Sequence, residues 1–132
     1  MNPLICHMLE PEIITLGHEI WRKTEPRRYQ VEAYSEAMAA LLETGGFGLL
    51  LDMGTGKTKI SIDIGFNLYK DSKIDAVIVI APNGIHAQWI EEQLPEHAPG
   101  PATARIWKAT GTQREAKEWH EIIKPENRRL RW

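Results

Sequence analysis

Residues 47–58 read Phe-Gly-Leu-Leu-Leu-Asp-Met-Gly-Thr-Gly-Lys-Thr, and the rest of the chain is interpreted from this segment. Its first part, Phe47–Leu51, is a short apolar run after a double glycine, which predicts a buried strand. A glycine-rich loop follows at residues 54–58, and a helix is expected to begin near Lys57. A strand, a glycine-rich loop and a helix N-terminus in this order are typical of a phosphate-binding loop.

Each residue type in this loop has a chemical reason to contact phosphate. Glycines let successive backbone N–H groups turn toward phosphate oxygens, a lysine reaches the outer phosphates, and a threonine hydroxyl can ligate Mg²⁺. The full phosphate-loop pattern has a glycine where this chain has Leu51. A simple glycine turn with a solvated lysine is the alternative. The residues expected to bind phosphate are Gly54, Thr55, Gly56, Lys57 and Thr58, with Thr58 also expected to hold Mg²⁺.

The helices on either side of the loop are predicted from apolar spacing. From Tyr29 the apolar residues recur every three or four positions as far as Gly45-Gly46, which predicts a helix that ends at the glycines. After the loop, the apolar residues of 60–68 alternate with polar residues or glycine, which by itself favours a strand. The preceding loop favours a helix, and we expect the helix, buried on more than one side.

The second half of the chain alternates between predicted strands and helices. Ala76–Ala81 is a β-branched run closed by Pro82, which is typical of an interior parallel strand. Further elements are expected as a helix at Ile85–Glu96, a strand at Thr103–Trp107, a helix at Gln113–Ile123 and the beginning of another element at Arg129–Trp132. This alternation predicts an α/β fold with a mainly parallel sheet flanked by helices.

Composition excludes several classes of protein. The chain has 132 residues and a net charge of −2, which gives no global signal for nucleic acid binding, so any such contact is expected to be local. Its single cysteine excludes an internal disulfide framework, and no Cys/His spacing resembles a zinc site. There is no signal-peptide pattern and no apolar run of membrane-spanning length, which leads us to expect a cytoplasmic protein; the resemblance described next implies that the cell is a bacterium or a phage-infected host.

Three motifs together resemble a known family. The loop preceded by Leu-Leu-Asp-Met at residues 50–53 is similar to the nucleotide-binding motif of superfamily-two helicases, especially the Swi/Snf-type branch and its phage relatives, where the first glycine is often missing. Upstream, residues 27–30 (Arg-Arg-Tyr-Gln) resemble the family's adenine-reading element, with Arg28 in place of its proline. Downstream, residues 78–82 followed by Gln88-Trp89 resemble its next conserved element, which faces nucleic acid.

The resemblance implies a partial RecA-like P-loop domain at residues 26–132, after a lead-in at residues 1–25. It implies that ATP and Mg²⁺ are the cofactors and that nucleic acid, in particular double-stranded DNA, is the partner of the motor to which this part belongs. The adenine-reading element implies roles for Arg27 and Gln30 in nucleotide binding, and the downstream element implies that Pro82, Asn83 and Gln88 face nucleic acid.

Side-chain chemistry supports the adenine assignment independently of the family. The amide of Gln30 offers a donor and an acceptor, which match the N6 and N7 edge of adenine and do not match guanine. An exposed polar residue at the start of a helix is the alternative for Gln30. For Trp89, a place in the core is the more common role for a tryptophan on an amphipathic helix than a base-stacking surface.

Hydrolysis in the resembled family needs an acidic Asp-Glu motif and arginines from a second lobe, and these 132 residues contain neither pattern. The adjacent pair Glu91-Glu92 falls within a predicted helix, where a solvated face is the ordinary interpretation. We therefore expect nucleotide binding without turnover by this chain alone. The alternative function is a free-standing nucleotide-binding or interaction module. A small P-loop kinase is disfavoured because no lid arginines or substrate pocket are recognisable.

The sheet raises a further expectation. In the resembled family other strands lie between the strand before the loop and the strand that ends in Ala-Pro. Here Phe47–Leu51 and Ala76–Ala81 are expected either to pair directly or to present unpaired backbone groups at an apolar edge. Unpaired edges favour pairing with another chain, so we expect self-association through the sheet edges.

Overall fold

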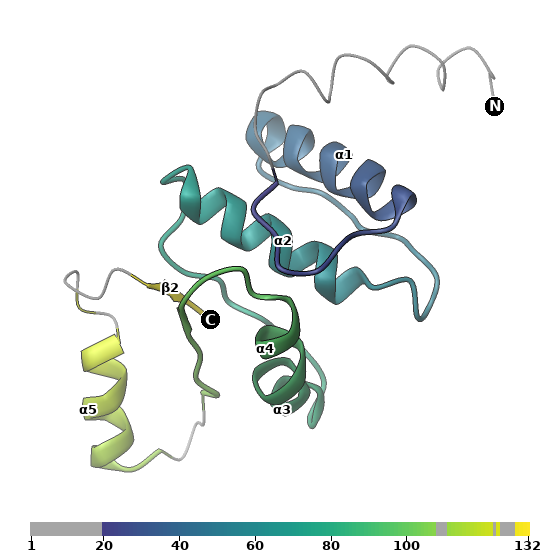
Figure 1. The fold of residues 1–132 in the computed structure, drawn as a ribbon. Coiled ribbons are helices and arrows are strands. Elements are labelled where there is room, and N and C mark those ends of the chain that lie inside the picture. Colours follow the sequence, from purple (N-terminus) through teal and green to yellow (C-terminus); the bar gives the residue numbers. More distant parts are fainter. Residues whose placement is uncertain (1–19, 108–110, 123, 125–128) are drawn as a thin grey trace, which may run out of the picture.

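The computed structural model describes residues 20–107, 111–122, 124 and 129–132. Most of the expected lead-in, including any short helix in residues 1–19, lies outside these described residues. Among them the order of elements is α1, α2, α3, a π-helical turn, α4, β1, α5 and β2 (Figure 1). Within the described part of the chain, no helix is long and apolar enough to cross a membrane.

Helix α1 spans Arg28–Thr44, which confirms the helix predicted from the three-to-four spacing. It ends at Gly45, which has a left-handed φ of 76° and donates its N–H to the carbonyl of Leu41 at 3.0 Å. A glycine in this conformation is the common way to end a helix, because it has no Cβ to crowd the turn.

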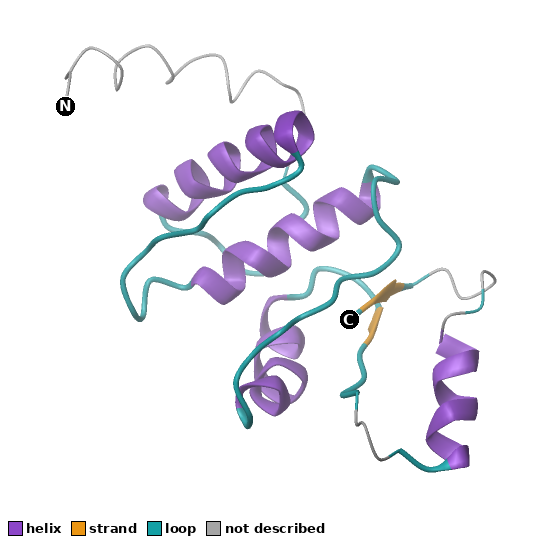
Figure 2. Ribbon diagram, turned by 180° about the vertical axis from the view of Figure 1, so that it is seen from behind, coloured by secondary structure: helices purple, strands orange, loops and turns teal. Residues whose placement is uncertain are grey.

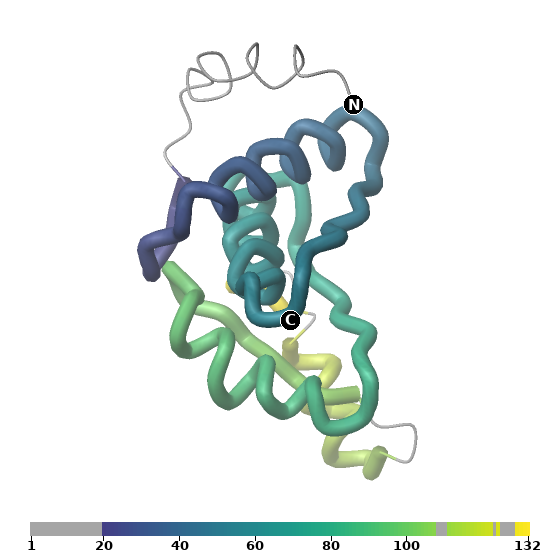
Figure 3. The backbone as a smooth tube through the Cα atoms, turned by 90° about the vertical axis from the view of Figure 1, so that its right-hand side faces the viewer, coloured from purple at the N-terminus to yellow at the C-terminus, as the bar shows by residue number. Residues whose placement is uncertain are grey.

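Helix α2 spans Lys57–Lys70, so the helix indicated by the loop overrides the alternating pattern that favours a strand. Ile60, Ile62 and Phe66 are at most 1% exposed, which confirms that α2 is buried on more than one side. The helix is central in the molecule: α1 packs along one side of it and α4 contacts another (Figures 1 and 3).

The helix predicted at Ile85–Glu96 is a continuous helical run with a widened turn inside it. It consists of α3 at Ile85–Gln88, a π-helical turn at Trp89–Gln93 and α4 at Leu94–His97. Pro95 is the second residue of α4, one residue beyond the π-helical turn, and it has no N–H to donate to the preceding turn, which accounts for the local change of hydrogen bonding. Glu91 and Glu92 are exposed in this turn, as a solvated face requires.

The sheet is much smaller than expected. Strand β1 at Ala102–Thr103 pairs in parallel with β2 at Leu130–Arg131, and an isolated parallel bridge joins Ala76 to Arg131 (Figure 2). The parallel direction agrees with the prediction, but the strand predicted at Thr103–Trp107 is wrong except at Thr103, the second residue of β1. Helix α5 at Gln113–Ile122 agrees with the predicted helix as far as Ile122; residue 123 lies outside the described part.

Two predicted strands are wrong as hydrogen-bonded elements. The segment Phe47–Leu51 contains no strand, and Ala76–Ala81 has pairing at its first residue alone, together with a bond from the Val77 N–H to the Arg131 carbonyl at 2.7 Å. Direct pairing of the two segments, one of the two outcomes considered from the sequence, therefore does not occur. Some of their apolar side chains are almost fully exposed: Leu50 is 96% exposed and Ile80 is 95% exposed. An extended segment becomes a strand only when a neighbour bonds its backbone, and these segments lack one among the described residues.

The core is built around α2 and is rich in tryptophan. Ile62, Phe66, Leu94 and Leu130 form the buried cluster, and partly buried hydrophobic residues pack against it. Three tryptophans line this cluster: Trp21 meets Phe66 edge to face at 5.6 Å between ring centroids, Trp132 lies 5.9 Å from Phe66, and Trp89 lies 5.9 Å from Trp132. Trp89 is therefore a core residue, as the amphipathic pattern indicates.

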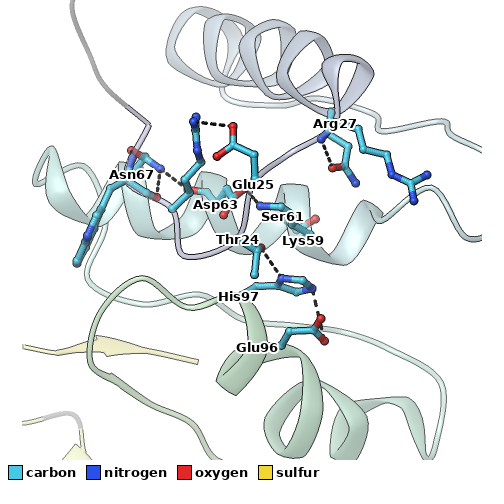
Figure 4. A network of polar contacts seen from close by, with 12 residues as sticks. Thr24, Glu25, Arg27, Lys59, Ser61, Asp63, Asn67, Glu96 and His97 are labelled. Atoms are coloured by element: carbon cyan, nitrogen blue, oxygen red, sulfur yellow. Dashed lines mark hydrogen bonds and ion pairs between the residues drawn. The ribbon is translucent and has the colours of Figure 1, made fainter.

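Polar contacts attach residues 21–24, at the described end of the lead-in, to α2 and α4. The backbone N–H of Trp21 donates to Asn67 Oδ1 at 2.9 Å, and Asn67 Nδ2 donates to the Trp21 carbonyl at 3.0 Å. Thr24 Oγ1 is 2.8 Å from Nδ1 of His97 in α4 (Figure 4). These contacts hold residues 21–24 against α2 and α4, just before α1 begins.

Candidate nucleotide-binding site

The candidate site is the loop at residues 52–58, which leads into α2. Gly54 and Gly56 have φ values of 77° and 81°, in the left-handed region that favours glycine. At Gly56 a Cβ would also collide with Gln30 Nε2, so a side chain there would require the Gln30 amide to move. The turn that the glycine spacing predicts is therefore present, and Gly56 allows the close approach of α1.

The lysine of the loop is folded back onto the chain that precedes it. Lys57 Nζ donates to the carbonyl of Leu51 at 2.8 Å and to the carbonyl of Asp52 at 2.7 Å. Thr55 Oγ1 donates to the same Asp52 carbonyl at 2.7 Å. The Lys57 ammonium group therefore lies against the carbonyl oxygens of Leu51 and Asp52 and offsets their partial negative charge.

The N-terminus of α2 is suited to an anion. Its N-cap residue is Gly56, which offers no side-chain cap, and its first turn contains no acidic residue. The first N–H groups of a helix have no partner inside the helix and carry partial positive charge. They point toward the loop, so a phosphate placed there would meet donors rather than a competing carboxylate.

The adenine-reading element lies against the phosphate loop. Gln30 is 7% exposed; its Oε1 accepts the Arg27 N–H at 2.9 Å, and its Nε2 donates to the Thr55 carbonyl at 2.9 Å. Figure 4 shows the dashed bond at Arg27, where α1 begins. An amide oxygen has a second lone pair and an amide nitrogen a second hydrogen, so each end keeps capacity for one further bond.

Tyr29 also contacts the loop, and the sequence motifs assigned it no role. Its hydroxyl donates to the Thr55 carbonyl at 3.0 Å, so that carbonyl accepts from two side chains of α1. The sequence signal for this contact is limited to the position of Tyr29 next to Gln30. The pairing itself depends on tertiary structure, which spacing along the chain does not reveal.

The remaining predicted site residues occupy different places. Thr58 is the second residue of α2 and is half-buried, next to Lys57, whereas the Arg27 residue is exposed at the N-cap of α1. The structure therefore brings the loop, Thr58, Arg27 and Gln30 to one region of the molecule, where α1 and α2 both begin.

The residues predicted to face nucleic acid lie between the Ala76–Ala81 segment and the π-helical turn. Pro82, Asn83 and Gln88 are all exposed. The Pro82 carbonyl accepts the N–H of Ile85, which begins α3, and Gln88 Nε2 donates to Glu92 Oε2 at 3.2 Å. Arg129 precedes β2 and Arg131 lies within it, where Arg131 Nη2 donates to the Lys124 carbonyl at 2.8 Å.

Two cavities lie away from the loop. One of about 690 Å³ is lined by the Ala76–Ala81 segment, by Asn83 and by tryptophans that include Trp89 and Trp107. Another of about 480 Å³ lies between residues 104–107 and α5. Across the residues that the structure describes, no group of three or more His, Cys, Asp or Glu side chains is arranged to hold a metal ion.

Comparison with known proteins gives one match. A family model described as ResIII, type III restriction enzyme, res subunit, matches residues 23–126. This range contains all the predicted nucleotide-binding and nucleic-acid-facing residues. Neither the curated proteins nor the solved structures gave a match.

Proposed function

Because the chain belongs to the family of type III restriction enzyme res subunits, a family of RecA-like P-loop domains of helicase-like ATP-dependent motors, we propose that it binds ATP with Mg²⁺ at residues 54–58. Domains of this family generally bind this cofactor pair. In this chain Lys57 would turn from the carbonyls of Leu51 and Asp52 to the outer phosphates, and the Thr58 hydroxyl would ligate Mg²⁺.

The observation that carries the proposal is the uncapped N-terminus of α2 behind a left-handed glycine loop. The loop has Gly54 and Gly56 in the left-handed region, and Lys57 directly at the start of the helix. Backbone donors, partial positive charge and an ammonium group are then close together, which is the chemistry that a polyphosphate requires. A Cβ at Gly54 would meet no atom within 4 Å, so the outer side of the loop is open.

The proposal is tested by titrating the chain with ATP and Mg²⁺ in a calorimeter. Lys57→Ala should weaken binding roughly 10- to 100-fold, because it removes a charge-assisted contact to phosphate. Lys70→Ala is the matched control: Lys70 is an exposed lysine at the other end of α2, and its loss should leave the affinity unchanged. Equal affinities for wild type and Lys57→Ala would show that the loop is not the phosphate site.

Gln30 is proposed to select adenine through its remaining donor and acceptor. A base edge that offers N6–H and N7 can satisfy both, whereas guanine presents two acceptors there. We expect ATP to be preferred over GTP by about 1–3 kcal/mol in a competition titration. Equal binding of the two nucleotides would remove this role, and Gln30 would then be a residue that joins α1 to the loop. A direct contribution of Arg27 to nucleotide binding is part of the same proposal.

We further propose that the motor is of the Swi/Snf type and acts on double-stranded DNA, with Pro82, Asn83 and Gln88 facing the nucleic acid. Their exposure and their position after the Ala76–Ala81 segment support this. Asn83→Ala and Gln88→Ala should each weaken binding to a labelled duplex, measured by fluorescence anisotropy. If both variants bind the duplex as wild type does, the assignment fails.

The chain by itself is proposed to bind nucleotide without turning it over, because its sequence holds no acidic motif of the kind that positions the attacking water. Phosphate release that rises with added DNA and disappears in Lys57→Ala would contradict this. A free-standing nucleotide-binding module is the second candidate. It would bind ATP with an affinity that duplex DNA does not change.

A further inference from the structure

One peptide of the phosphate loop is held from outside by two side chains. The carbonyl of Thr55 accepts the Tyr29 hydroxyl at 3.0 Å and Gln30 Nε2 at 2.9 Å. Both donors come from the first turn of α1. The loop therefore rests on α1 through a single carbonyl with both of its lone pairs engaged.

The orientation of this carbonyl determines where the next N–H points. A trans peptide is planar, and its C=O and N–H groups point in opposite directions. The carbonyl of Thr55 is fixed toward α1, so the N–H of Gly56 is directed away from α1. Backbone N–H groups in a glycine loop are the donors that cradle phosphate. Without these hydrogen bonds the Thr55–Gly56 peptide could change its orientation readily, because the residue that follows it, Gly56, has no Cβ to restrict its φ angle.

From this geometry we propose that Tyr29 is a positioning residue: its hydroxyl fixes the Thr55–Gly56 peptide so that the Gly56 N–H faces the phosphates. The inference rests on the proposed nucleotide site and goes further by naming the residue that orders it. With the hydrogen bond from Gln30 alone, the Thr55 carbonyl could still change its orientation around that hydrogen bond. A second donor from the neighbouring residue of the same helix removes that freedom.

The burial of the two residues separates this role from simple packing. Gln30 is 7% exposed, so its amide needs partners whatever the loop does. Tyr29 is 36% exposed, so solvent could satisfy its hydroxyl without any bond to the loop. Burial therefore does not account for the bond between Tyr29 and Thr55, whereas orientation of the peptide does.

The experiment uses Tyr29→Phe, which removes the hydroxyl and keeps the ring. Calorimetric titrations with ATP, ADP and adenosine should show ATP and ADP binding weakened roughly 3- to 10-fold, the scale of one hydrogen bond. Adenosine, which lacks phosphate, should bind both proteins equally. In ¹⁵N–¹H spectra without nucleotide, the Gly56 amide signal should move while the melting temperature stays the same.

Tyr34→Phe is the matched control, because Tyr34 lies further along α1 and its ring is likewise retained. It should change neither the ATP affinity nor the Gly56 signal. If wild type binds ATP but Tyr29→Phe binds it equally well with an unmoved Gly56 amide, the positioning role is overturned. If Tyr29→Phe weakens adenosine as much as ATP, Tyr29 acts on the base and the inference is also overturned. A wild type that binds no ATP would overturn the proposed function itself. The Gly56 amide signal would still report on the hydrogen bond between the Tyr29 hydroxyl and the Thr55 carbonyl.

Discussion

Lys59 and Asp63 form a buried ion pair in the middle of α2. Lys59 Nζ is 2.6 Å from Asp63 Oδ2, and the two side chains are 7% and 5% exposed. Among the described residues, Asp63 Oδ1 has no hydrogen-bond partner. Burial raises the pKa of the Asp63 carboxyl, and the hydrogen bond and charge of Lys59 counteract part of that rise. Each buried charge is stabilised by the other, so removing one partner would leave the remaining charge buried and unpaired.

Lys59→Met tests this dependence. Removing the ammonium leaves Asp63 buried with its charge unpaired, so we expect a loss of about 3–5 kcal/mol in the free energy of unfolding near neutral pH. Because the Asp63 pKa then rises further, the folded state binds a proton more tightly than the unfolded state. Its stabilising contribution is complete below the unfolded pKa of about 3.9 and is lost as the pH rises through the folded pKa.

The difference between wild type and Lys59→Met should therefore shrink as the pH is lowered in a series of urea titrations. Lys70→Met, an exposed lysine of the same helix, should cost little at any pH. The double variant Lys59→Met with Asp63→Leu should recover most of the lost stability. A difference that stays constant across the pH range would show that Asp63 is not the group responsible.

At the scale of elements, α2 packs against the last residue of the chain through a glycine. A Cβ at Gly65 would lie 2.8 Å from Trp132 Cη2 and 3.3 Å from Val77 Cγ2. The absence of a side chain lets the indole lie directly on the helix, where it also reaches Phe66. This contact joins α2 to the sheet of β1 and β2. Trp132 follows β2, and its backbone N–H donates to the Thr103 carbonyl in β1 at 2.8 Å.

Gly65→Val should destabilise the chain by roughly 1–3 kcal/mol, because the added methyl groups occupy the space of the Trp132 ring. Lys70→Val is the control for placing a β-branched residue in α2 without a clash. Urea unfolding followed by tryptophan fluorescence measures both. Because valine has a better helix propensity than glycine, propensity alone would make Gly65→Val more stable than wild type. A Gly65→Val variant at least as stable as wild type would therefore show that the Trp132 contact does not depend on the glycine.

The helices were predictable from sequence and the strands were not, for a physical reason. Helix α1 satisfies its own backbone and carries its ending signal at Gly45-Gly46, so local sequence suffices. For α2, the alternating apolar pattern favours a strand, whereas the preceding glycine loop correctly predicts a helix. The strands at Phe47–Leu51 and Ala76–Ala81 require partners to exist, and apolar composition says nothing about whether a partner is at hand.

The candidate site was predictable to a similar extent. The glycines, Lys57 and Thr58 follow from spacing, and Gln30 follows from the family resemblance. That Lys57 folds onto Leu51 and Asp52, and that Tyr29 donates to Thr55, are contacts between parts of the chain that no local pattern encodes.

At the scale of the whole molecule, the segments Phe47–Leu51 and Ala76–Ala81 still carry exposed apolar side chains. Ile78 and Ile80 are 87% and 95% exposed, while the alternate residues Val77 and Val79 face inward. This alternation is that of a strand with one covered face. Unpaired backbone beside exposed β-branched side chains favours pairing with another strand. We propose that a second copy of the chain supplies it, so that the chain self-associates through these edges.

Sedimentation velocity over a range of concentrations tests self-association. Wild type should form larger species as the concentration rises, and Ile80→Lys should shift the equilibrium toward monomer, because a charge would be buried in the paired edge. Leu42→Lys is the matched control: Leu42 is 59% exposed but lies on α1, outside both extended segments. A wild type that is monomeric at every concentration would rule out this mode of association.

The assignment of residues 54–58 as the nucleotide site can be mapped residue by residue in ¹⁵N–¹H spectra during titration with ATP and Mg²⁺. We expect the largest changes at the amides of Gly54, Gly56 and Lys57, with a smaller change at the side-chain amide of Gln30. The change should saturate with a single affinity, and in Lys57→Ala it should require roughly 10- to 100-fold more ATP. Unmoved loop amides, with changes gathered instead around Trp89 and Trp107 at the 690 Å³ cavity, would contradict the assignment.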